Sequence, residues 1–135
     1  MTDALQIPWP PSTNSLWRAR AGRNILSQRY REWRKAAGLE VMAQRPKKHS
    51  GPVSIAIELS APNKRAFDID NRSKALLDLL VMCHVIEADD ASVVRELHVR
   101  CGEGFTGARV FVRPAANETL SPSEREGVVM ISPAT

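Results

Sequence analysis

Residues 53–60 constrain the fold most, because their side chains alternate between large apolar types and small or polar types. A period of two puts every second side chain on the same face of an extended strand. Such a strand packs its apolar face against a covering layer of the protein. The pattern predicts a strand whose covered face is Val53, Ile55, Ile57 and Leu59.

Two helices are expected, one before and one after this strand in the sequence. The first covers about residues 27–42 and has Ser27 as a suitable N-cap, and the second covers about residues 71–82. Each carries an apolar stripe at helical spacing. The stripes are Tyr30, Trp33, Ala37 and Val41 in the first helix, and Ala75, Leu76, Leu79 and Leu80 in the second.

Three further strands, at about residues 4–7, 92–101 and 108–113, complete the expected sheet. The glycines between the last two predict that they form a hairpin. The expected fold class is α/β (α+β): a mixed or mainly antiparallel sheet of about four strands with two helices packed on one face.

The composition is that of a globular protein. Of the 135 residues, 43% are hydrophobic and 25% are charged, and no apolar run is long enough for a membrane span or a signal peptide. We therefore expect a cytoplasmic protein without membrane contact. Its length suits one domain over residues 1–114, with a polar, weakly ordered tail over 115–135. Cys83 and Cys101 are expected to be buried thiols, because neither has metal-ligand spacing.

The net charge of +4 understates how basic the N-terminal third is. Between residues 18 and 48 the only acidic residues are Glu32 and Glu40. Such a region attracts a polyanion, although an isolated basic helix is more often a solvated surface. The basic residues are Arg18, Arg20, Arg23, Arg29, Arg31, Arg34, Lys35, Arg45, Lys47 and Lys48.

Two acidic pairs, about twenty positions apart, flank the second helix. Asp68 and Asp70 have the period-two spacing that projects both carboxylates from one side of a strand. Asp89 and Asp90 follow the helix and can fold back beside them. Lys74, one helical turn beyond Asp70, can point its ammonium at the same place. Several carboxylates beside one cation suit a Mg²⁺ ion that binds phosphate, and such a centre can hydrolyse a phosphodiester.

The first acidic pair also has a structural explanation. Aspartate and asparagine favour helix starts, so either Asp70 or Asn71 is a possible cap for the second helix. If Asn71 is the cap, the carboxylate of Asp70 stays free. Asp68 is harder to explain structurally, because aspartate is disfavoured in strands.

The second acidic pair, at residues 89–90, is a common turn sequence. Lys74 has Asp78 four residues later, which is the spacing of an ordinary surface salt bridge. The lysine is therefore shared between a catalytic and a structural explanation. The histidines are scattered without ligand spacing and are expected to be structural; they are His49, His84 and His98.

Taken together, several short motifs resemble the RusA family of Holliday junction resolvases over most of residues 5–113. The resemblance implies a homodimeric, Mg²⁺-dependent endonuclease that nicks two strands symmetrically at a four-way DNA junction. Relatives of this kind are often encoded by phages or prophages. The motifs are Pro10-Pro11-Ser12-Thr13-Asn14, Asp68-Ile69-Asp70-Asn71 followed by Lys74, Val85-Ile86-Glu87 before Asp89-Asp90, and Val93-Val94.

By this resemblance, Asp68 and Asp70 are metal ligands and Lys74 is the catalytic lysine. The third acid has two candidates, because His84 stands at the family's glycine position and Ala88 adds one residue before the acidic pair. Counting from the helix favours Asp89 as the third acid. Anchoring on the residues after the pair favours Asp90, which we take as the third catalytic and metal-binding acid.

The expected mechanism is hydrolysis of DNA by water that Mg²⁺ activates, with the lysine stabilising the pentacoordinate phosphorus. A second departure from the family is Phe67, where relatives often have a basic residue. The expected DNA-backbone contacts are Arg18, Arg20, Arg23, Lys64 and Arg65. The rival hypotheses are a non-catalytic DNA-binding module and a phosphohydrolase of small nucleotides.

Overall fold

The computed structural model describes residues 4–13, 17–20 and 23–115. Its elements follow the chain as strands, a long helix, a central strand, a short 3₁₀ turn, a second helix and two final strands. They are β1 (Leu5–Ile7), β2 (Trp17–Arg20), β3 (Arg23–Leu26), α1 (Gln28–Ala43), β4 (Val53–Ser60), η2 (Ile69–Asn71), α2 (Ser73–Met82), β5 (Val94–Cys101) and β6 (Gly107–Pro114).

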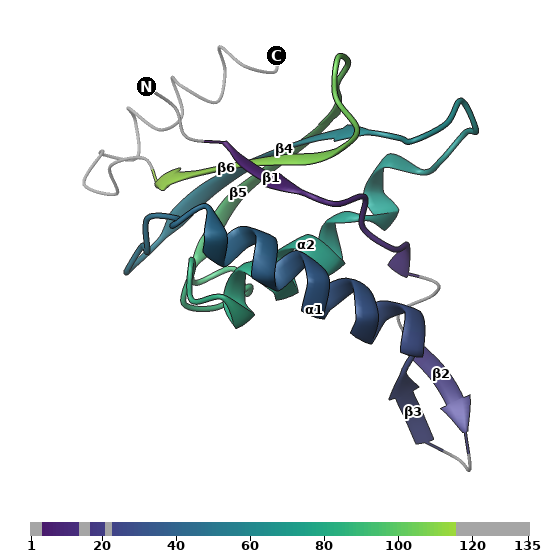
Figure 1. Cartoon of the computed structure of the whole chain (residues 1–135). Coiled ribbons are helices and arrows are strands. Elements are labelled where there is room, and N and C mark those ends of the chain that lie inside the picture. The colour runs from purple at the N-terminus through teal and green to yellow at the C-terminus, as the bar shows by residue number, and fades with distance from the viewer. Residues whose placement is uncertain (1–3, 14–16, 21–22, 116–135) are drawn as a thin grey trace, which may run out of the picture.

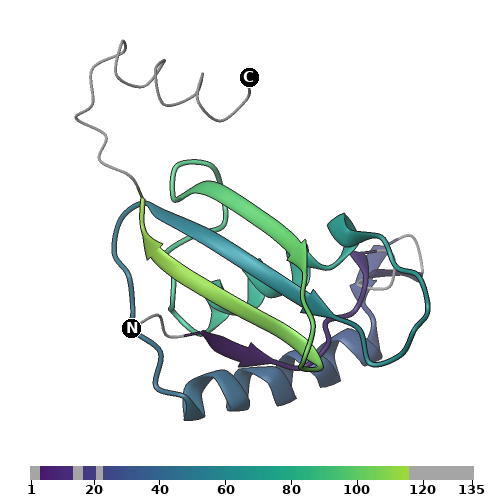
Figure 2. The same cartoon turned by 90° about the horizontal axis from the view of Figure 1, so that it is seen from above.

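The main sheet has four strands in the order β1-β6-β4-β5. Strand β4 pairs parallel with β5 and antiparallel with β6, and β1 pairs antiparallel with β6. Helices α1 and α2 lie on the same side of this sheet (Figures 1 and 2). The predicted fold class, a mixed sheet with two helices on one face, is therefore confirmed.

The core lies between the helices and the apolar face of β4. Val53, Ile55, Ile57 and Leu59 are at most 1% exposed, and their polar neighbours along β4 are partly exposed. In the register of the sheet, Ile57 pairs with Val110 of β6, which in turn pairs with Leu5 of β1. The alternation seen in the sequence therefore sets which face of the sheet is buried.

Both helices form at the predicted places. The Ser27 side chain accepts a hydrogen bond from the Tyr30 amide at 3.1 Å, as an N-cap does. Helix α2 buries the predicted stripe Ala75, Leu76, Leu79 and Leu80. The three leucines belong to the core cluster that includes the sheet, whereas Ala75 packs with Tyr30 of α1. Helix α2 connects the parallel strands β4 and β5, the usual role of a crossover helix.

The predicted hairpin of the last two strands is wrong, because β4 lies between β5 and β6. Pairing with both strands satisfies both edges of the buried β4, so the glycine-bearing loop over 102–106 crosses that strand instead of folding back on β5. Strand β5 is consequently an edge strand, and Leu97 is 40% exposed. Cys83 is a buried thiol as predicted, but Cys101, on this edge strand, is exposed.

The arginine and glycine content of residues 16–24 is typical of an exposed, mobile arm rather than of paired strands. The described part is instead an antiparallel hairpin, in which Arg18 pairs with Ile25 and Arg20 pairs with Arg23 (Figure 1). Backbone pairing between the strands outweighs the arginine and glycine content from which a loop was inferred. The predicted tail, from residue 116 onward, lies outside the described residues. Within the described part, no helix is both long enough and apolar enough to cross a bilayer.

Candidate active site

Asp68 and Asp70 lie just beyond the carboxyl end of β4, at the approach to α2. Asp68 has extended backbone angles, but Asp70 sits in the 3₁₀ turn η2, so the two residues do not share a strand as predicted. Both side chains are exposed, and η2 lies beside strand β5. The pair therefore occupies the edge where the parallel strands β4 and β5 end, which is a common ligand position in α/β sheets.

Neither Asp70 nor Asn71 caps α2. The N-cap position belongs to Arg72, whose side chain makes no capping hydrogen bond. Asn71 instead donates its side-chain amide to Asp68 Oδ2 at 3.3 Å. The capping explanation therefore does not account for the carboxylate of Asp70, which is left available for another role.

Lys74, in the first turn of α2, is held between two carboxylates. Its Nζ lies 3.0 Å from Asp78 Oδ1 and 2.9 Å from Asp89 Oδ2. The hydrogen bond to Asp89, supported by that to Asp78, raises the pKa of Lys74, so the ammonium is kept charged. The predicted salt bridge to Asp78 is thus present, and it coexists with a second contact that crosses to the loop after α2.

Behind Lys74, Asp78 is half-buried and has a raised pKa, chiefly because burial disfavours its charge. The hydroxyl of Tyr30, a buried residue of α1, donates to Asp78 Oδ2 at 3.5 Å. On the other side, the bond from Lys74 holds the pKa of Asp89 below its usual value. The lysine is therefore positioned from both the core and the loop.

The two acids of the second pair have different environments. Asp89 contacts Lys74, whereas Asp90 Oδ1 accepts hydrogen bonds from the Ser92 hydroxyl and from the Ser92 amide at 2.9 Å. These bonds form the local turn that the sequence allowed as an alternative. They also hold the pKa of Asp90 below its usual value. Among the described residues, no three acidic, histidine or cysteine side chains stand together as a metal-ligand group.

Sequence reasoning missed Arg72, which joins the N-terminal proline segment to the acidic turn. Its guanidinium lies 4.9 Å from the ring centre of Trp9 and donates to the Pro10 carbonyl at 2.6 Å. Trp9 in turn packs edge-on against Phe67, with ring centres 5.0 Å apart. The arginine thereby fixes the start of α2, while its Nε is buried without a partner in the described part of the chain.

Thr13 also links the N-terminal proline segment to the acidic turn. Its hydroxyl donates a hydrogen bond to the Asn71 carbonyl at 3.0 Å. This bond gives a structural role to the family motif at residues 10–13, for which the sequence alone predicts none. The signal for that role was the position of the motif next to Trp9, since an aromatic beside prolines suits packing against a turn.

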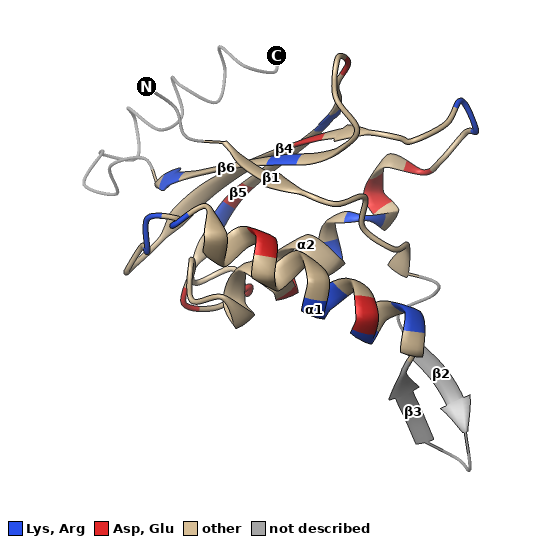
Figure 3. Ribbon diagram, viewed as in Figure 1, with Lys and Arg blue, Asp and Glu red and all other residues tan. Residues whose placement is uncertain are grey.

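Lys64 and Arg65 lie exposed in the loop between β4 and η2. The Arg65 amide donates to the Asn63 side chain at 2.9 Å, which gives the loop tip a local turn. Figure 3 shows this basic loop tip directly before the acidic segment of η2. For Arg18, Arg20 and Arg23 only the backbone in the β2–β3 hairpin is described.

Comparison with known proteins gives consistent matches. A family model described as endodeoxyribonuclease RusA matches residues 8–113. The crossover junction endodeoxyribonuclease RusA of Escherichia coli strain K12 is 36% identical over 96 residues, covering 69% of this chain and 78% of that protein. The protein of the same name in Enterobacteria phage HK97 is 27% identical over 117 residues, covering 84% and 94%.

These matches first define a class: the chain is a hydrolytic enzyme, a nuclease that acts on DNA. The family model spans most of the chain, and the Escherichia coli relative exceeds 30% identity over more than two thirds of it. The chain therefore belongs to the endodeoxyribonuclease RusA family.

Proposed function

We propose that this protein is a Mg²⁺-dependent endonuclease that resolves four-way DNA junctions by paired, symmetric nicks. One observation carries the proposal: the chain belongs to the RusA family, and in it the exposed Asp68 and Asp70 directly precede α2, whose first turn carries Lys74. Its relatives bear the name crossover junction endodeoxyribonuclease and come from bacteria and phages. We propose the same substrate here, in the cytoplasm of a bacterial cell.

The chemistry of the donor set fits a magnesium ion. Asp68 and Asp70 offer hard carboxylate oxygens from exposed positions, and no sulfur ligand belongs to the candidate set. Magnesium needs only a few protein carboxylates, because water and substrate phosphate oxygens fill its other positions. The bound ion would lower the pKa of a water molecule and offset charge on the phosphoryl oxygens.

Asp90 is proposed as the third ligand and Asp89 as the residue that orients Lys74. We assign these two roles from the contacts of Asp89 and Asp90, because the carboxylate of Asp89 is already paired with the ammonium of Lys74. Lys74 would approach the scissile phosphate while remaining protonated, and its charge would stabilise the pentacoordinate phosphorus.

Contacts to the DNA backbone are proposed for the loop before the acidic turn and for the β2–β3 hairpin. A two-fold homodimer would supply two equivalent sites, so that matching strands of a junction are cut in a symmetric pair. The residues proposed to hold the backbone are Arg18, Arg20, Arg23, Lys64 and Arg65.

A cleavage assay separates this proposal from its rival, a DNA-binding module without catalytic activity. A synthetic four-way junction and a linear duplex of the same sequence are incubated with the protein in Mg²⁺ or in EDTA. Paired nicks that are confined to the junction and to the Mg²⁺ reaction support the proposal. Junction binding without nicking under any metal condition would instead identify a binding module.

A further inference from the structure

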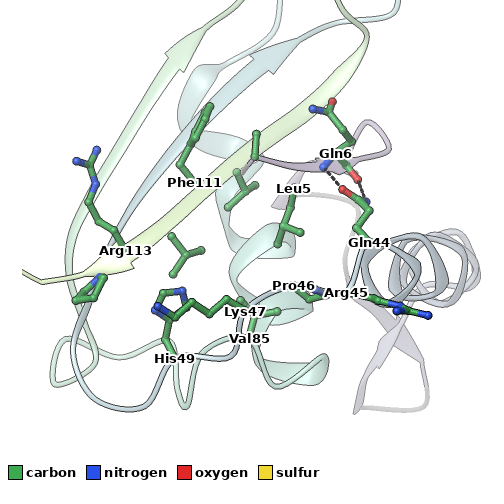
Figure 4. Close-up of a pocket in the computed structure, with 14 residues that line it drawn as sticks. Leu5, Gln6, Gln44, Arg45, Pro46, Lys47, His49, Val85, Phe111 and Arg113 are labelled. Atoms are coloured by element: carbon green, nitrogen blue, oxygen red, sulfur yellow. Dashed lines mark hydrogen bonds between the residues drawn. The ribbon is translucent and has the colours of Figure 1, made fainter. Parts of the chain in front are cut away.

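The two edges of the main sheet differ in how open they are to another strand. At one edge, β1 is only three residues long. The Gln44 side chain accepts a hydrogen bond from the Gln6 amide at 2.8 Å and donates one to the Gln6 carbonyl at 2.7 Å (Figure 4). These are the backbone groups through which an added strand would pair, so Gln44 closes this edge.

The other edge is β5, which is eight residues long and has β4 as its single neighbour among the described strands. An edge strand of this length can pair with another chain. The register with β4 puts Leu97 and Val99 on the face that the helices cover. Leu97 is nevertheless 40% exposed, so the helix layer leaves part of this edge uncovered. A further strand beside β5 would cover it.

The opposite face of β5 carries Glu96, His98 and Arg100, which alternate with the apolar residues. The Arg100 side chain is 74% exposed although it forms an ion pair with Glu58 of β4. Glu96 is also exposed, and it accepts a hydrogen bond from the Ser54 hydroxyl at 3.1 Å. The edge strand therefore presents an acid and a base on one face, four residues apart.

The order of these residues makes β5 complementary to a second copy of itself. When a strand pairs with its own copy about a two-fold axis normal to the sheet, the strands run antiparallel and one residue faces itself. If His98 is that residue, Glu96 faces Arg100 of the second copy. On the other face, Leu97 then faces Val99. Opposite charges and apolar side chains that face each other in this way stabilise strand pairs.

The neighbouring registers lack this match of charges. With Leu97 at the axis, Arg100 faces Val94 of the second copy. With Val99 at the axis, the arginine faces His98. The register about His98 is therefore the one of the three that brings the arginine to a carboxylate.

We propose that two copies of the chain join through β5, in antiparallel register with His98 at the two-fold axis, to form one continuous sheet. The inference rests on the homodimer of the proposed function and names the surface through which that dimer forms. Backbone groups on the outer side of β5 pair between the copies, as in other cases of strand addition to a sheet edge. The helices of both copies lie on the same side of the joined sheet.

Disulfide trapping tests this register. In a Cys101→Ser background, the variant His98→Cys places two thiols directly opposite each other, with Cα atoms about 4.5–5.5 Å apart. A disulfide can bridge that distance. Oxidation with copper phenanthroline should therefore convert most of this variant into a covalent dimer, which non-reducing gel electrophoresis measures.

The matched control is Glu96→Cys in the same background. This position is also exposed, but in the proposed register its two copies lie about 13 Å apart along the strands, beyond the reach of a disulfide. Glu96→Cys alone should therefore stay uncross-linked. An equimolar mixture of Glu96→Cys and Arg100→Cys should cross-link, because these two positions face each other.

Analytical ultracentrifugation tests the interface without a disulfide. The wild type should sediment as a dimer. Leu97→Lys should raise the dissociation constant of the dimer at least about tenfold, because it places a cation at the paired edge. The control Leu39→Lys replaces a leucine of α1 that is 68% exposed and lies outside this edge, and it should change that constant by less than about twofold.

A wild-type chain that stays monomeric would leave the edge to a different partner and overturn the inference. Equal cross-linking of His98→Cys and Glu96→Cys would overturn it as well. If the wild type nicks a junction in Mg²⁺ but fails these tests, only the interface falls. If it cross-links as expected but neither binds nor nicks a junction, the proposed function falls and the interface stands.

Discussion

The Lys74 ammonium donates a hydrogen bond to Asp89 Oδ2 at 2.9 Å, which joins the first turn of α2 to the loop that follows this helix. The contact links Asp89, of the second acidic pair, to the helix that directly follows Asp68 and Asp70 in the chain. It also gives the neighbouring acids Asp89 and Asp90 different partners, because Asp90 bonds to Ser92. Replacing Asp89 and replacing Asp90 should therefore have different effects on DNA cleavage.

Asp89→Asn should slow cleavage about tenfold by releasing Lys74, and its effect should be non-additive with that of Lys74→Ala. Asp90→Asn should slow cleavage at least about 100-fold and raise the Mg²⁺ concentration needed, because a metal ligand is lost. Single-turnover rates over a Mg²⁺ titration measure both effects. A shifted metal requirement in the Asp89 variant alone would reverse the assignment of the two acids.

Gly107→Ala should destabilise the fold by at least about 2 kcal/mol more than Gly104→Ala. Both glycines have positive φ angles, of 110° and 87°, but a Cβ at residue 107 would lie only 2.5 Å from the Ile7 carbonyl oxygen of β1. A Cβ at residue 104 would meet nothing within 4 Å. Urea unfolding of the two variants isolates the clash from the backbone strain that they share, and equal midpoints would contradict this role for Gly107.

The two thiols should react at very different rates in the native protein. Cys101 is exposed, whereas Cys83 is buried and burial raises the pKa of its thiol. Iodoacetamide at pH 8 should therefore label Cys101 first, and Cys83 only after denaturation. Peptide mass spectrometry measures the sites, with Cys101→Ser as the variant that should stay unlabelled while folded. Comparable labelling of both residues would contradict the burial of Cys83.

Stability should fall as the pH drops below about 6.5, in part because of His49. The pKa of His49 is lowered in the folded protein by burial and by Lys47, so the unfolded chain binds more protons in this range. A state that binds more protons is favoured by acid, which here is the unfolded state. Urea midpoints between pH 5 and 8 should slope less in His49→Gln than in the wild type, and identical slopes would exclude this contribution.

Much of the fold followed from local patterns in the sequence. The alternation over 53–60 and the apolar stripes of both helices need only near neighbours, and the structure has each element within a few residues of its prediction. The order of the strands did not follow from local patterns, because β5 and β6 are adjacent in sequence but are separated by β4 in the sheet. Pairing of this kind depends on contacts far apart in the chain, which glycine-rich turn sequences do not report.

In the candidate site, too, the sequence predicts relations between near neighbours but not contacts between distant residues. Asp70 and Lys74 lie four residues apart, so a local pattern was enough to group them. The contact of Lys74 with Asp89 depends on the path of a loop, and no periodicity predicts that path. Arg72 was missed for a similar reason, since its partners Trp9 and Pro10 lie more than sixty positions away.

The most direct test of the account is single-turnover cleavage of a four-way junction by Asp70→Asn in Mg²⁺, with binding measured in parallel. Asparagine preserves the size of the side chain and removes the charge that a metal ligand needs. The account predicts that cleavage falls at least about 100-fold while the dissociation constant for the junction stays within about threefold of the wild-type value. Cleavage at the wild-type rate in this variant would contradict the assignment of the metal site.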